Sequence, residues 1–212
     1  MNTQDTSLET LQDIRRMMEK SSRFISLSGL SGVSAGVFAL AGAYTAHSWL
    51  GRKYEHGASS GPGRYFVENF DMLIWKLLFL AAAVLALSLS FAFYFTWKKA
   101  KKNAVPMWGH SSKKLLINLL IPLVTGGMYV LALLYYGDWL FIAPACLVFY
   151  GLALVNASKY TLTDIRYIGL LEIALGLFNM FWPDYSLYFW AVGFGVLHII
   201  YGLIMWWKYD RN

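Results

Sequence analysis

Residues 72–102, MLIWKLLFLAAAVLALSLSFAFYFTWKKAKK, decide the fold class of this chain. Residues 72–97 hold a single charge, Lys76, and are long enough to cross the roughly 30 Å hydrocarbon core of a bilayer as a helix. Four lysines follow at once, as is typical where a membrane helix ends in the cytoplasm. The stretch therefore predicts a transmembrane helix with its carboxyl end inside.

Five further apolar runs follow the same pattern. The predicted spans are residues 24–49, 72–97, 115–136, 139–157, 166–182 and 186–207. Of the 212 residues, 58% are hydrophobic and only 14% are charged, whereas a soluble domain carries roughly 25% charged residues. The sequence thus predicts an all-α, polytopic transmembrane bundle of six helices, with an N-terminal segment 1–23, a membrane domain 24–207 and a tail 208–212.

The basic residues gather at alternate ends of these spans. With the N-terminus inside, the inner segments hold 14 of the 18 Lys and Arg residues: Arg15, Arg16, Lys20, Arg23, Lys98, Lys99, Lys101, Lys102, Lys113, Lys114, Lys159, Arg166, Lys208 and Arg211. This asymmetry predicts that both termini are cytoplasmic (N-in/C-in). Aromatic residues lie at the span ends, as is typical of anchors at the membrane–water interface, and they support this placement; examples are Trp75, Trp139, Tyr185 and Trp206. The basic residues that give the net charge of +6 therefore set the orientation of the chain in the membrane, and no nucleic-acid partner is expected.

Residues 1–23 contain a predicted amphipathic helix. Thr6 and Glu9 fit a capping box, and Leu8, Leu11, Ile14 and Met18 recur at helical spacing. Two interpretations stay open. The helix either lies on the anionic inner leaflet or extends the first membrane helix into the cytoplasm.

Glu172 and His198 are the candidate functional residues. Both lie well inside predicted spans, where ionisable groups are costly and face protein or water. From Arg166 and Lys208, their depths are roughly 9 and 14 Å, which places them within about one turn of each other on adjacent antiparallel helices. The pair is either a structural hydrogen bond or a proton-linked transport site.

Small residues flank both positions at spacings of three and four. One face carries Gly169, Glu172, Gly176 and Asn179; another carries Ala191, Gly195, His198 and Gly202; the first span carries Gly29, Gly32 and Gly36. Small residues let membrane helices approach closely and let polar groups bond across the contact. We therefore expect a helix-packing seam that brings Glu172 to His198.

The third span contains Pro122, which removes one backbone hydrogen bond and can kink the helix. Asn118 and Asn156 lie near predicted inner ends. They either line an inward-open vestibule together with Glu172 and His198 or are simply hydrated by interfacial water, and we expect hydration. No catalytic, cofactor-binding or metal-ligating motif is present, and Cys146 is the single cysteine. The chain is therefore expected to be non-enzymatic.

The last hairpin resembles the short repeat of bacterial acid-resistance membrane proteins. Gly169, Gly176, Pro183, Gly195 and Gly202 carry this resemblance within a frame of Leu and Ile, over about 40 residues. It implies a six-helix protein of the bacterial inner membrane, acting as an accessory or stress-response component. Expected partners are the lipid bilayer and either a second copy or another membrane protein. The alternative is a small proton-linked transporter or channel that uses Glu172 and His198.

Overall fold

The computed structural model describes residues 28–54, 70–103 and 108–211, and these form helices without any strand. The all-α prediction is thereby confirmed. The predicted N-terminal helix and most of the loop 50–71 lie outside the described residues.

The helices follow the predicted spans in order. The long elements are α2 (Gly29–Tyr54), α3 (Phe70–Lys102), α4 (His110–Tyr136), α5 (Ile142–Ala157) and α6 (Ile165–Asn179). Short turns η1 (Trp139–Phe141), η2 (Ser158–Tyr160) and η3 (Pro183–Tyr185) connect the later ones. The final helix is divided into α7 (Ser186–Trp190), η4 (Ala191–Leu197), α8 (His198–Met205) and η5 (Trp206–Asp210), of which η4 and η5 are π-helical. It runs to Asp210, beyond the predicted end at residue 207.

Five of these helices are long and apolar enough to cross a membrane: residues 29–50, 72–102, 110–136, 139–160 and 183–210. The sixth, α6, has 15 residues and a length of about 22 Å, less than the roughly 30 Å core. Within the apolar 18-residue stretch of α3, and within that of α4, only 6% is buried inside the protein. Large apolar surfaces of this kind are typical of contact with lipid.

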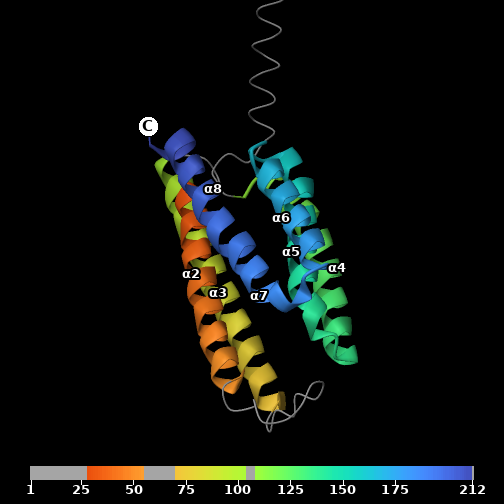
Figure 1. Ribbon diagram of the computed structural model, residues 1–212. Coiled ribbons are helices and arrows are strands. Elements are labelled where there is room, and N and C mark those ends of the chain that lie inside the picture. The colour runs from red at the N-terminus through yellow and green to blue at the C-terminus, as the bar shows by residue number, and fades with distance from the viewer. Residues whose placement is uncertain (1–27, 55–69, 104–107, 212) are drawn as a thin grey trace, which may run out of the picture.

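The helices pack in two groups (Figure 1). α3 and the η4–α8 part of the final helix pack on α2, whereas α4 and α6 pack on α5. α7 and η4 contact both groups, so the final helix joins them. Near the end of the bundle that contains the C-terminus, an apolar cluster of Leu162, Ile165, Ile168 and Met205 fills the contact, with Leu154, Leu197 and Tyr201 against it.

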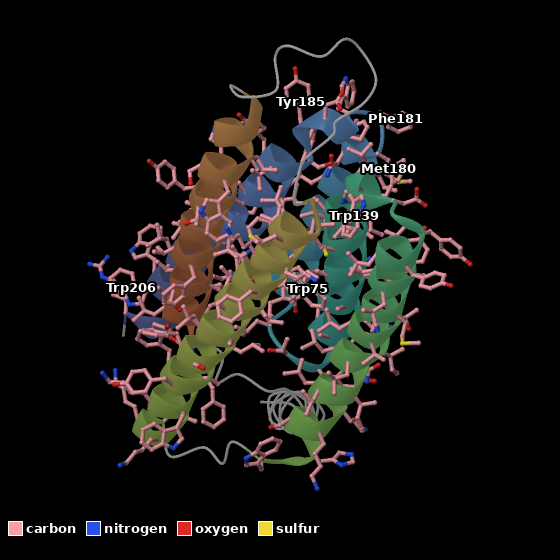
Figure 2. The ribbon with its side chains drawn as sticks, turned by 90° about the horizontal axis from the view of Figure 1, so that it is seen from below. Trp75, Trp139, Met180, Phe181, Tyr185 and Trp206 are labelled. Atoms are coloured by element: carbon pink, nitrogen blue, oxygen red, sulfur yellow. The ribbon has the colours of Figure 1, made fainter. Side chains whose placement is uncertain are left out.

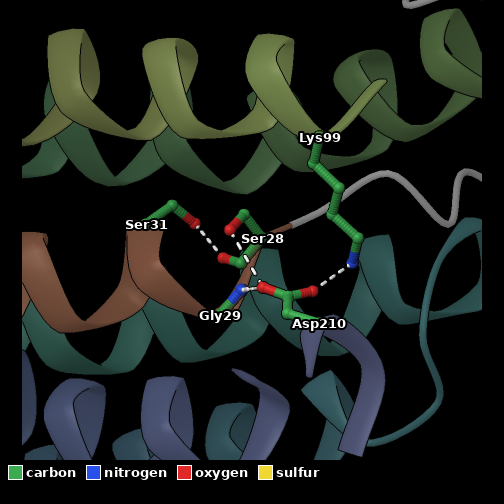
Figure 3. A network of polar contacts seen from close by, with 5 residues as sticks. All are labelled: Ser28, Gly29, Ser31, Lys99 and Asp210. Atoms are coloured by element: carbon green, nitrogen blue, oxygen red, sulfur yellow. Dashed lines mark hydrogen bonds and ion pairs between the residues drawn. The ribbon is translucent and has the colours of Figure 1, made fainter. Parts of the chain in front are cut away.

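Polar contacts hold the predicted inner ends of the helices together. Asp210 contacts the start of α2 and the end of α3 (Figure 3), and Lys208 contacts Asp164 before α6. At the other end, η1 contacts η3. There, Trp139, Met180, Phe181 and Tyr185 lie together, whereas Trp206 lies apart from them (Figure 2). The described helices therefore alternate in direction (Figure 1).

The predicted glycine seam divides into two separate contacts. A Cβ atom on Gly36 would lie 2.6 Å from the carbonyl oxygen of Gly195, so the seam of α2 faces the final helix. A Cβ atom on Gly169 would lie 2.8 Å from the carbonyl oxygen of Gly151, and one on Gly176 would meet Pro144 and Leu147, both also on α5. The glycines of α6 therefore face α5 and not the final helix, because α5 presents the complementary small surface. Gly29 and Gly32 likewise meet the final helix around Gly202.

α4 continues through Pro122 without ending. Proline has no N–H, so the carbonyl of Asn118, four residues earlier, loses its helical donor. The Asn156 Nδ2 group donates to that oxygen at 2.8 Å. The prediction that Asn156 is simply hydrated is therefore wrong, because its amide supplies the hydrogen bond that Pro122 cannot make.

Candidate functional site

Glu172 is completely buried at the contact between α6 and the final helix. A Cβ atom on Gly193 would come within 2.6 Å of Glu172 Oε2 and would also meet Leu147. The missing side chain of Gly193 therefore makes room for the carboxyl group. Neither carboxyl oxygen has a hydrogen-bond partner among the described residues.

His198, at the start of α8, has both ring nitrogens engaged. Nδ1 lies 3.0 Å from the Gly193 carbonyl oxygen, and Nε2 lies 2.8 Å from the Tyr150 hydroxyl of α5. Because a carbonyl oxygen can only accept, Nδ1 carries a proton and donates it. In the neutral imidazole Nε2 then accepts from Tyr150, and in the imidazolium it donates to Tyr150. The ring also stacks on Phe194, with centroids 5.9 Å apart.

The structure brings Glu172 and His198 together, with 3.5 Å between Glu172 Oε1 and His198 Nδ1. This is an ion-pair distance if both groups are charged. One proton can therefore reside in two ways: on a carboxylic acid beside neutral imidazole, or on an imidazolium beside a carboxylate. Together with Tyr150 and Gly193, these residues form what we name the Glu172 cluster.

The cluster lies where the two helix groups meet. Tyr150 and Glu172 belong to the α4–α5–α6 group, whereas Gly193 and His198 belong to the final helix, which packs on α2. A change of charge in the cluster therefore acts on the contact between the groups.

A second polar cluster closes the end of the bundle that contains the C-terminus. The Asp210 carboxylate accepts hydrogen bonds from the Gly29 backbone N–H at 2.8 Å and from the Ser28 hydroxyl at 3.0 Å, and it pairs with Lys99 at 2.6 Å (Figure 3). It lies at the N-terminus of α2, where a helix presents unpaired N–H groups and a partial positive charge. Asp210 thus caps α2 from the opposite end of the sequence.

A third contact joins the loop before α6 to η5. Asp164 Oδ2 accepts hydrogen bonds from Lys208 Nζ at 2.7 Å and from the Tyr209 hydroxyl at 3.0 Å. The hydrogen bond from Lys208, helped by the one from Tyr209, lowers the pKa of the Asp164 carboxyl, and partial burial opposes this only in part.

Sequence reasoning missed Tyr150 and Gly193. Tyr150 lies in an apolar span, where a tyrosine carries no specific signal. Gly193 is five residues before His198, and this spacing falls on one face only because η4 is π-helical, with contacts from residue i to i+5. A search at helical spacings of three and four cannot detect it.

Comparison of the chain with protein-family models, curated proteins and solved structures found no match. Within residues 28–54, 70–103 and 108–211, no group of three His, Cys, Asp or Glu side chains is placed to hold a metal ion. The site is therefore interpreted from its own chemistry.

Proposed function

We propose that this chain is a non-enzymatic, multi-pass protein of the bacterial cytoplasmic membrane whose packing responds to acidification. It would act as an accessory or stress-response component, in line with the resemblance of its last hairpin to acid-resistance membrane proteins. The observation that carries the proposal is the completely buried Glu172 carboxyl, 3.5 Å from His198 and without a hydrogen-bond partner in the described structure.

The chemistry of the cluster supports a response to protons. With one proton, the Glu172–His198 pair is neutral overall in either arrangement. A second proton leaves a carboxylic acid beside an imidazolium, which is a net positive charge in a buried contact and therefore costs free energy. Tyr150 of α5 is hydrogen-bonded to His198, and Tyr201 follows His198 by three residues on α8; neither tyrosine supplies a compensating negative charge at acid pH. Acidification should then loosen the final helix from α6.

Hydrogen–deuterium exchange on the protein in lipid nanodiscs tests this response. Between about pH 7 and about pH 5, the range in which histidines change charge, amides of α6 and α8 should lose protection beyond the intrinsic effect of pH. His198→Gln should abolish the loss, whereas His110→Gln, at an exposed histidine that begins α4, should keep it. Unchanged protection in the wild-type protein would refute the proposal.

The proposed orientation has both termini in the cytoplasm. It is supported by the lysines at the ends of α3 and η5 and at the start of α4, which the helix directions bring to one end. In a Cys146→Ala background, Asp184→Cys should react with a membrane-impermeant maleimide on intact cells, and Lys113→Cys should not. The reverse labelling pattern would overturn the orientation.

Proton-linked transport is the second candidate. The π-helical segment η4, directly before His198, favours it, because such segments are frequent at functional sites and interrupted helices are typical of transporters. Proteoliposomes with an imposed pH gradient distinguish the two roles. A His198-dependent proton flux would establish transport, whereas acid-induced loosening without flux would support the accessory role.

A further inference from the structure

We infer that Phe194 sets the pH at which the His198 imidazole becomes an imidazolium, because the face of its ring attracts the charged form. This inference rests on the proposed proton response and identifies a residue that tunes it. Phe194 has no proton of its own to exchange, so it acts only through His198.

The Phe194 ring is stacked on the imidazole of His198. The two centroids are 5.9 Å apart, and the ring planes differ by only 22°. Phe194 precedes His198 by four residues, so both side chains lie on one face of the final helix. A cation within about 6 Å of an aromatic centroid is attracted by the negative charge density of the ring face. The geometry therefore favours the imidazolium over the neutral imidazole at this contact.

Two further aromatic rings hold Phe194 in place. The Tyr150 ring of α5 lies 5.0 Å from it, and the Trp190 ring of α7 lies 5.2 Å from it, both measured between centroids. Both spacings lie in the range of favourable aromatic pairs. Because the ring is held from two elements, it needs no rearrangement when His198 gains its charge.

The charged form of His198 also keeps its hydrogen bonds. The Nδ1–H group donates to the Gly193 carbonyl oxygen at 3.0 Å, and in the imidazolium the Nε2–H group donates to the Tyr150 hydroxyl oxygen at 2.8 Å. His198 is only 7% exposed, so bulk water stabilises the charge little. A cation–π contact is worth most where the cation is desolvated, so Phe194 offsets part of the cost of charging this buried ring.

The other neighbours of the imidazole supply no opposite charge in acid. Glu172 faces it from α6 and Tyr150 from α5, and Tyr201 follows it on α8. α2 also packs on η4 and α8, but it has no titratable side chain over residues 29–43. Once Glu172 is protonated, all of these groups are neutral. The ring face of Phe194 then remains as an attraction for the positive charge.

Fluorinated phenylalanines at position 194 test this inference. Each added fluorine draws electron density from the ring face and hardly alters the size of the ring, so it weakens the attraction for a cation. Nitrogen NMR of labelled histidines in nanodiscs, with the His198 signal assigned from His198→Gln, gives the midpoint of imidazolium formation. The midpoint should fall stepwise from phenylalanine through its mono-, di- and trifluorinated forms, by about 0.5–1.5 pH units in total.

Two further variants complete the experiment. The same fluorinated series at Phe178, which is 59% exposed on α6, is the matched control and should leave the midpoint unchanged. Phe194→Leu removes the ring face altogether and should lower the midpoint by about as much as the trifluorinated ring.

The outcomes separate the role of Phe194 from the proposed function. A midpoint that does not depend on the number of fluorines overturns the inference even if Phe194→Leu moves it, because packing alone then explains the leucine effect. Hydrogen–deuterium exchange on the same samples reports the proposed loosening independently. A fluorine-dependent midpoint with unchanged amide protection would refute the loosening and keep the role of Phe194. If His198 takes up no proton in the range where histidines titrate, both fail.

Discussion

Gly193 makes the burial of Glu172 sterically possible. Its backbone gives His198 an acceptor, and the space beside it holds the Glu172 carboxyl. Each of these roles depends on close approach, which explains why a residue without a side chain stands at this point of the final helix. The Glu172 cluster therefore requires glycine at position 193, because even a methyl side chain would clash with the carboxyl group.

Gly193→Ala should destabilise the protein by about 1–3 kcal/mol, because the new methyl group overpacks against Glu172 Oε2 and Leu147. Gly127→Ala on α4 is the matched control, since nothing lies within 4 Å of its Cβ position, and it should be neutral or mildly stabilising. Unfolding in mixed micelles measures both. Equal stability of the two variants would contradict the close packing described for Gly193.

At the scale of the element, α4 and α5 show how a membrane helix tolerates proline. Pro122 leaves the Asn118 carbonyl without its helical donor, and Asn156 replaces that donor from the neighbouring helix. The hydrogen bond lost within one helix thus becomes a bond between two helices. It favours one register of α4 against α5.

Asn156→Ala should lose about 0.6–1.7 kcal/mol of stability, the range of interhelical hydrogen bonds in membranes. In a Pro122→Ala background the loss should be clearly smaller, because residue 122 then supplies its own N–H to Asn118. A double-mutant cycle on unfolding free energies measures the difference. Additive losses would mean that Asn156 does not compensate for the proline.

At the scale of the whole molecule, two carboxylates join segments far apart in sequence. Asp210 connects the N-terminus of α2, the end of α3 and η5, and Asp164 connects the start of α6 to η5. Both contacts use the last turn of the chain, so the final helix holds the two helix groups together at this end.

Asp210→Ala should destabilise the protein by about 3 kcal/mol, because it removes the α2 cap and the carboxylate that pairs with the 12% exposed Lys99 side chain. Lys99→Met in the same background should recover part of that loss. The exposed Asp184→Ala, at the opposite end, serves as control and should change little. Thermal unfolding in detergent compares the variants, and equal midpoints for Asp210→Ala and Asp184→Ala would contradict the capping role.

The Asp164 contact should weaken at acid pH. The pKa of Asp164 is lower in the folded protein than in the unfolded chain, where it is about 3.9. The contact therefore contributes its full stability above about pH 3.9, and this contribution is lost as the pH falls through the lower pKa of the folded protein. Wild-type protein should therefore be more stable than Asp164→Asn near neutral pH, and the difference should begin to shrink as the pH falls below about 4 and vanish only below the lower pKa of the folded protein. Unfolding curves over pH measure this, and a difference that persists in acid would exclude the carboxylate as its source.

The sequence alone determined the helical class, the approximate positions of the helices along the chain and the nearness of Glu172 to His198. These follow from local quantities: the length of an apolar run, the charges at its ends and the depth of a polar residue along its helix. They require no knowledge of which helix lies beside which.

Only the tertiary structure decided which helices and residues contact each other. Gly169 and Gly176 face α5, Gly195 faces α2, and Tyr150 and Gly193 complete the Glu172 cluster. Helical periodicity tells which residues share a face but not which neighbour that face meets, and the π-helical turn changes even the shared face. The Asp210 cap on Gly29 joins residues at opposite ends of the chain, a contact that arises only once the helices have packed.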